Sequence, residues 1–178
     1  MGGDIVIHHR GASYWRPIIL RSSASRINSL NQRLANLASK LADQAHEPAR
    51  QQADSLYQLL AAPREIFARL CPELCPPCDE ACCRRVSQRG VMDTADLIFL
   101  AAQGITSLPQ AEREDGLCPW LSQAGCVLPW NARPFACLHY LCEPLQRSMS
   151  LSKAERIRIC LTQAGDARSR LLRLFMEP

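Results

Sequence analysis

Residues 27–41 read Ile27-Asn-Ser-Leu30-Asn-Gln-Arg-Leu34-Ala-Asn-Leu37-Ala-Ser-Lys-Leu41, and this stretch decides the fold class. Its aliphatic residues recur at every third or fourth position, a spacing that places side chains on one face of an α-helix. The pattern predicts a helix over residues 23–46. Pro48 ends this helix, because proline lacks a backbone donor and disfavours helical geometry in the residue before it.

The chain that follows the first helix also favours helix. Pro48 suits the first turn of a second helix over residues 48–61, where a missing backbone donor costs nothing. The side of this helix that we expect to be buried consists of Ala49, Ala53, Leu56, Leu59 and Leu60. Pro63 then opens a short third helix over residues 64–70. The break at Pro48 indicates a helical hairpin or a kinked rod, and we expect the hairpin. The apolar stripe of the first helix packs on the chain's own core or, alternatively, on a second copy in a homodimer.

Two further helices are expected in the second half of the chain. Asp93 has the residue type and position of a helix cap, so the sequence predicts a helix over residues 94–103. The last segment, residues 146–178, shows a helical period to its end. Ser152 and Glu155 have the spacing of a capping box, which predicts the start of that helix.

The segment between these helices is rich in cysteine. Nine of the ten cysteines lie between Cys71 and Cys142, and only Cys160 lies outside. Prolines interrupt the first run of cysteines three times, so we expect its thiols on turns and not on a helix. The first 25 residues do not have the pattern of a secretion signal. We therefore expect a cytoplasmic protein with reduced thiols.

Reduced thiols separated by two to four residues can close chelate rings around a soft metal ion. They outnumber the four thiolates that one tetrahedral ion takes, which indicates two sites or one iron–sulfur cluster with a further ion. Arg84 and Arg133 are candidates to stabilise such an anionic site through hydrogen bonds to sulfur. The spacing is Cys71-x3-Cys75-x2-Cys78-x3-Cys82-Cys83, then Cys118-x7-Cys126, and finally Cys137-x4-Cys142.

Three blocks of the cysteine-rich segment resemble a known family. They read Cys75-Pro-Pro-Cys-Asp-Glu-Ala-Cys-Cys-Arg84, then Cys118-Pro-Trp-Leu with Gly-Cys126, and Trp130-Asn-Ala-Arg-Pro-Phe-Ala-Cys-Leu-His-Tyr-Leu-Cys142. This order of residues is similar to that of the cysteine-cluster family described as zinc- or iron-chelating domains of the CxxCxxCC type. A related group resembles the flagellin lysine N-methylases. The chain departs from the family pattern by one extra residue in the first block, by Trp130 in place of tyrosine, and by Leu138 in place of arginine.

The resemblance covers about 70 residues of the chain and implies a metal site. It implies an iron–sulfur cluster or zinc as the cofactor. Cys71 is a further candidate ligand. The ligands that the resemblance implies are Cys75, Cys78, Cys82, Cys83, Cys118, Cys126, Cys137 and Cys142.

Together these expectations describe a mainly α protein in four parts. Residues 1–22 form an arm or flexible tail, and residues 23–70 form the N-terminal helical region. Residues 71–145 form a small, irregular cysteine-rich core that metal staples together. Residues 146–178 form a C-terminal helix that packs around this core with the N-terminal hairpin.

The expected function is metal binding, with the helices as an interaction surface for a protein partner. The alternative is an iron–sulfur-dependent enzyme or electron carrier, methyltransferase-like or a redox accessory. No phosphate loop or acid–base pair that would indicate catalysis is apparent in the sequence. We expect no nucleic-acid partner, because the net charge of +4 includes no block of like charges. We expect no membrane span, because no apolar run approaches the ~20 residues that a span needs.

Overall fold

The elements of the chain are mostly helices, as expected. The structure is a computed structural model that describes residues 23–78, 92–110, 118–122 and 125–177. The arm expected at residues 1–22 lies outside this range. The elements are α1 (Ser23–Leu41), η1 (Gln44–His46), α2 (Glu47–Leu74), α4 (Thr94–Ala102), β1 (Leu121–Ser122), β2 (Gly125–Cys126), η3 (Trp130–Ala132), α5 (Phe135–Leu138), α6 (Glu143–Arg147) and α7 (Leu151–Met176).

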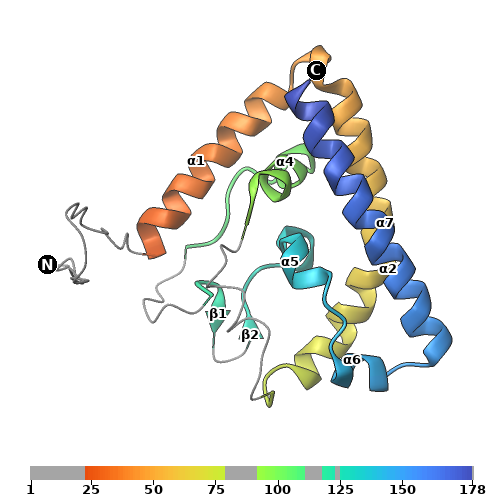
Figure 1. The fold of residues 1–178 in the computed structure, drawn as a ribbon. Helices are drawn as coiled ribbons and strands as arrows, with labels where there is room; N and C mark the ends of the chain where they lie inside the picture. Colours follow the sequence, from red (N-terminus) through yellow and green to blue (C-terminus); the bar gives the residue numbers. More distant parts are fainter. Residues whose placement is uncertain (1–22, 79–91, 111–117, 123–124, 178) are drawn as a thin grey trace, which may run out of the picture.

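The first helix forms where the leucine stripe predicts it, but it ends at Leu41 and not at residue 46. Asp43 explains the early end, because its side chain accepts a hydrogen bond of 2.9 Å from the Ala45 N–H and caps the short 3-10 turn η1. From this turn, α1 and α2 diverge as the two sides of an open angle, and α4 lies between them (Figure 1). The hairpin predicted from the sequence is therefore an open one.

The second and third predicted helices are a single helix, so the predicted break at Pro63 is wrong. Helix α2 continues through Pro63 and through Pro72 to Leu74. An interior proline typically destabilises a helix by about 3 kcal/mol, since it removes one hydrogen bond and crowds the preceding turn. Leu60 and Phe67, on either side of Pro63, are almost fully buried. The burial of these side chains offsets the local cost of the proline.

Helices α2 and α7 form an antiparallel pair along one side of the molecule (Figure 1). Small side chains line their contact, and Ala49, Ala53 and Ala167 have no exposed surface. The Gln52 side-chain amide donates a hydrogen bond of 3.2 Å to the Ala167 carbonyl across this contact. Alanine at these positions lets the two helix axes approach closely.

The short helix α4 occupies the centre of the fold. All seven residues from Ala95 to Ala101 are buried, as expected for a helix that is almost entirely apolar. Asp93 caps the helix as the sequence predicts, and Asp93 and Asp96 form a complete capping box. Gly104 ends it with a φ of 75°, a conformation that favours glycine.

The described part of the cysteine-rich segment is irregular, as expected, with one small antiparallel β-pair that joins Leu121 to Cys126. Trp120, which precedes β1, packs into the core and anchors the β-pair there. Its side chain is 1% exposed, and its indole N–H donates a hydrogen bond of 3.0 Å to the Pro109 carbonyl. The metal staple expected for this segment stays a prediction.

The last helix is continuous from Leu151 to Met176, and its start differs from the prediction. Ser150, and not Ser152, is the N-cap, and its hydroxyl accepts a hydrogen bond of 3.3 Å from the Lys153 N–H. The predicted capping box of Ser152 with Glu155 is therefore wrong, because the N-cap lies two residues before Ser152. None of the described helices combines the length and the apolar composition that a bilayer crossing requires.

Candidate metal centre

The C-terminal turn of α2 carries the first two cysteines of the cluster. Cys71 lies in the last turn of the helix, and the Cys75 N–H, at its C-cap, donates a hydrogen bond of 2.9 Å to the Cys71 carbonyl. The predicted placement of these thiols on turns is therefore wrong for Cys71. Residues four apart lie on the same face of a helix, and the two thiols form a side-chain hydrogen bond.

This contact makes the two thiols chemically unequal. The hydrogen bond with Cys75, together with burial, raises the pKa of the Cys71 thiol. The hydrogen bond from Cys71, with help from the positive charge of the nearby Arg133, lowers the pKa of Cys75 to about 7 against the effect of burial. Cys71 therefore keeps its proton and donates it to the sulfur of Cys75, which is the more readily ionised thiol of the pair.

Two residues from the second half of the chain lie beside this pair. Cys142 is the N-cap of α6, and its charge is close enough to Cys71 to raise the pKa of that thiol. Arg133 acts on both thiols of α2 in the opposite sense. The Arg133 guanidinium stacks on the Trp130 ring at 3.4 Å, and its Nε donates a hydrogen bond of 3.2 Å to the Leu128 carbonyl. Cys142 thus acts on a thiol that is 71 positions away in the sequence, and Arg133 acts on both thiols of α2.

The remaining candidates lie on separate segments. Cys78 follows Cys75 in a turn, and its N–H donates a hydrogen bond of 3.2 Å to the Cys75 carbonyl. Cys126 lies in β2 and Cys137 lies in α5, both half-buried, while Cys118 precedes β1 and is buried. Among the residues that the structure describes, no three His, Cys, Asp or Glu side chains are grouped closely enough to hold a metal ion. The candidates outside the described residues are Cys82, Cys83 and Arg84.

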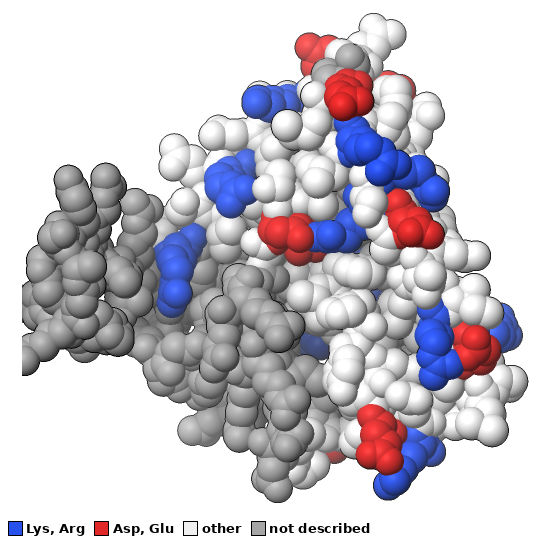
Figure 2. Space-filling view, viewed as in Figure 1, with Lys and Arg blue, Asp and Glu red and all other residues white. Residues whose placement is uncertain are grey.

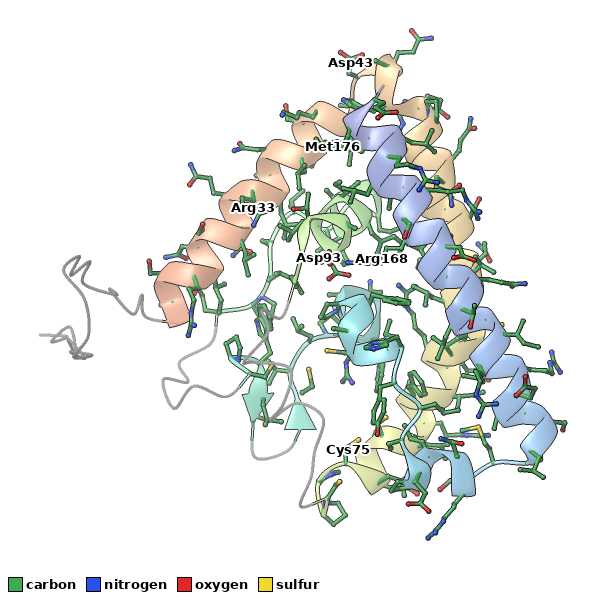
Figure 3. All side chains as sticks on the ribbon, viewed as in Figure 1. Arg33, Asp43, Cys75, Asp93, Arg168 and Met176 are labelled. Atoms are coloured by element: carbon green, nitrogen blue, oxygen red, sulfur yellow. The ribbon has the colours of Figure 1, made fainter. Side chains whose placement is uncertain are left out.

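A buried carboxylate fixes the segment that carries Arg133 and Cys137. The Asp96 side chain is 6% exposed, and one of its oxygens accepts a hydrogen bond of 3.0 Å from the Phe135 N–H at the start of α5. Burial raises the pKa of Asp96 above its usual value. The Arg168 Nε lies 3.5 Å from the same oxygen, and Arg168 also pairs with Asp93 (Figure 3). Asp96 therefore ties α4 to the start of α5 and to α7.

A small cavity lies beside Asp96, where helices α2, α4, α5 and α7 meet. Its volume is about 10 Å³, roughly the space that one water molecule needs. Arg133 and Arg168 line it together with Asp96, and the apolar part of its wall comes from Leu56, Leu60, Phe99 and Phe135. A cavity of this size has no room for an organic substrate.

The sequence did not indicate the roles of three charged residues in the interior or near it. They are Asp96, which links α4 to α5 and α7, and the arginines Arg64 and Arg168. Arg64 had a detectable signal. It follows Leu60 by four positions, and the same spacing had already marked the buried face of α2 through Leu56. A charged residue on a predicted apolar face is a candidate for function. The contact of Arg168 with α4 had no local signal, because it joins positions far apart in the sequence.

Comparisons of the chain with protein-family models, with curated proteins and with solved structures found no match.

Proposed function

We propose that this chain is a metal-binding protein whose cysteines hold zinc or an iron–sulfur cluster, with the helices as a supporting surface for a protein partner. The observation that carries the proposal is the contact between Cys71 and Cys75, with Cys142 and Arg133 beside it. Cys75 lies at the end of α2 that is farthest from Asp43 (Figure 3), and Cys142, from a distant part of the chain, is close enough to act on Cys71. Soft donors of this kind select zinc, copper(I) or iron–sulfur clusters over hard ions.

The donor set fits such a centre in chemical terms. A metal requires thiolates, and Cys75, with a pKa of about 7, ionises more readily than Cys71. The positive charge of Arg133 stabilises thiolate at both Cys71 and Cys75. The resemblance to the CxxCxxCC family supports the same assignment and extends the ligand set to Cys82 and Cys83.

The proposal is tested by purifying the full chain without oxygen and measuring iron, zinc and acid-labile sulfide per mole of protein. Iron with equimolar sulfide and a brown colour would identify a cluster, and a colourless protein with stoichiometric zinc would identify a zinc site. A visible spectrum that bleaches on reduction and returns on oxidation would favour the electron carrier. A folded protein that contains none of iron, zinc and copper would refute metal binding.

Matched cysteine variants locate the site. We expect Cys75→Ser to lose metal, since serine is a much weaker ligand for soft ions than thiolate. Cys160→Ser is the control, because Cys160 is a half-buried residue in α7, the helix that carries none of the proposed ligands. If Cys75→Ser keeps its full metal content, Cys75 is not a ligand. A loss of metal in Cys160→Ser as large as that in Cys75→Ser would show that the assay reports folding and not ligation.

A further inference from the structure

Arg64 is a buried charge for which the described residues supply no hydrogen-bond acceptor. It lies in α2 and is 7% exposed, and Nε and both terminal nitrogens of its guanidinium have no hydrogen-bond acceptor in the part of the chain that the structure describes. Burial lowers the pKa of this arginine, which reflects the loss of water around its charge. A guanidinium has five N–H donors and remains charged in proteins, so an uncompensated one opposes folding strongly.

The surroundings of Arg64 compensate its charge only in part. The guanidinium carbon lies 4.9 Å from the centre of the Tyr57 ring and 5.4 Å from the centre of the Phe99 ring. Aromatic faces attract a cation, but they do not replace the planar oxygen pair that a guanidinium binds best. The carboxylates of α4 do not fill this role, because Asp93 and Asp96 pair with Arg168. Within the described ranges, no carboxylate therefore supplies the oxyanion that this guanidinium would bind best.

We propose that Arg64 is the anchor of a binding site for a small molecule that carries a carboxylate or phosphate group. The guanidinium would bind two oxygens of that group side by side, and the rings of Tyr57 and Phe99 would form the apolar walls. Tyr57 is 38% exposed, and in this proposal its ring would rotate to admit the ligand to Arg64. The guanidinium nitrogens are fully covered, and this favours a small ligand over the surface of a macromolecule.

This site is distinct from the thiol centre. Arg64 and Cys71 are seven residues apart in α2, which corresponds to about 10 Å along a helix. Arg133 perturbs the pKa of Cys71 and of Cys75, and Arg64 is not among the groups that do. The anion site therefore does not depend on the metal proposal, and either can fail without the other.

The experiment measures binding of inorganic phosphate and of acetate to the full chain. Thermal unfolding and titration calorimetry are run in buffer whose ionic strength is held constant with sodium chloride. We expect at least one of the two anions to raise Tm in a saturable manner. Saturation by phosphate alone identifies a phosphate ligand, and saturation by acetate identifies a carboxylate ligand. Absence of saturable binding of both anions overturns the proposal.

Two variants test whether Arg64 is responsible. Arg64→Met keeps most of the side-chain volume and removes the charge, so we expect the affinity for the anion to fall at least about tenfold. Arg69→Met is the matched control, an exposed arginine of the same helix, and it should bind like the wild type. Equal anion affinity in Arg64→Met and Arg69→Met overturns the proposal.

The anion-free stability of Arg64→Met separates binding from a structural role. If Arg64 serves a ligand, removal of its unpaired charge leaves Tm unchanged or higher without anion, and the wild type overtakes the variant only as anion is added. A lower Tm in Arg64→Met at every anion concentration, with no anion dependence, shows a structural cation–π residue and overturns the proposal. If Arg64→Met does not fold, Arg64→Lys decides, because it keeps the charge and loses the planar fork. Unchanged anion affinity in Arg64→Lys would then contradict the proposed binding mode.

Discussion

The two halves of α2 differ in what holds them in place. The packed half, residues 47–63, lies along α7 with Ala49, Ala53, Leu56 and Leu60 buried. The thiol-bearing half, residues 64–75, buries a charged guanidinium and brings thiols together. Apolar burial explains the first half. It explains the second half only in part, because Ile66 and Phe67 are buried there beside polar groups whose burial costs free energy. Such local exceptions are typical of functional sites.

Metal removal should produce the largest difference between the halves. Binding of a structural zinc ion contributes on the order of 10 kcal/mol to folding, so treatment with chelator and reductant should destabilise the segments that carry ligands. We expect amides of residues 70–75 and 135–142 to lose protection in hydrogen exchange, while amides of residues 97–101 keep it. Identical protection with and without metal would show that apolar packing also holds the thiol-bearing half.

Loss of a core side chain should have the opposite pattern of effects, lowering the stability of the fold without changing the metal content. Leu97 in α4 has no exposed surface, so Leu97→Ala should lower the free energy of unfolding by about 2–5 kcal/mol through the cavity that it leaves. The measurement is urea unfolding, and the metal content of the folded fraction should not change. Leu151→Ala is the control, because Leu151 is 90% exposed and should have an effect within about 0.5 kcal/mol. Metal loss in Leu97→Ala would mean that the core and the thiol centre form one cooperative unit.

The first helix and the packed half of α2 could be predicted from the sequence, because apolar periodicity reports burial directly. The stripe from Ile27 to Leu41 predicted α1, and the alanines and leucines after Pro48 predicted the buried face of α2. The sequence did not predict that α2 continues through Pro63. Local rules assign the proline a fixed penalty, and the compensating contacts of Leu60 and Phe67 come from tertiary structure.

The thiol-bearing half could be predicted only as a set of residue types. The cysteines indicated metal chemistry, but their grouping depends on contacts between distant segments. No local pattern places Cys142 beside Cys71 or makes Asp96 a hydrogen-bond acceptor for the Phe135 N–H. The same limit applies to charge. On the face shown in Figure 2, basic and acidic residues are interspersed. Composition alone does not single out Arg64, which is buried, or Arg168, which is only 21% exposed.

Asp96→Asn should lower both the stability of the fold and the affinity for metal, by less than the changes described above. Asparagine has a single acceptor oxygen, so it cannot serve both the Phe135 N–H and the Asp93 N–H, and it loses the attraction of Arg168. We expect a loss of about 1–3 kcal/mol in the free energy of unfolding, measured with urea. We also expect weaker metal binding, because α5 is less firmly placed. Asp166→Asn, at an exposed position of α7, is the control. Full metal affinity in Asp96→Asn would show that the hydrogen bonds of Asp96 do not support the thiol centre.

The cap at Asp93 predicts a pH dependence of at most about 1 kcal/mol, since the carboxylate is largely exposed. Burial alone would raise the pKa of Asp93, but hydrogen bonds from the Asp96 N–H and from Arg168 lower it below 3.8 overall. A lowered pKa in the folded state means that the stabilisation is present at neutral pH and is lost as the pH falls below about 3.8. Asp93→Asn keeps the cap and removes the charge. The difference in unfolding free energy between wild type and variant should therefore vanish at low pH, and a difference that grows there would reverse the assignment.

Gly165 offers the smallest effect and a gain of stability. It lies within α7, where glycine is about 0.5–1 kcal/mol less favourable than alanine because the unfolded chain has more freedom to lose. A Cβ added at this position would meet only the Cζ of Phe135 at 3.8 Å, an ordinary contact. Gly165→Ala should therefore raise the free energy of unfolding by about 0.5–1 kcal/mol in a urea titration. Because Phe135 begins the helix that carries Cys137, the same variant tests how tightly α7 and the cysteine-rich segment are packed. A loss of stability in Gly165→Ala would show that the added methyl group collides with Phe135. Helix α7 and the cysteine-rich segment would then be packed too tightly at this point to accept a larger side chain.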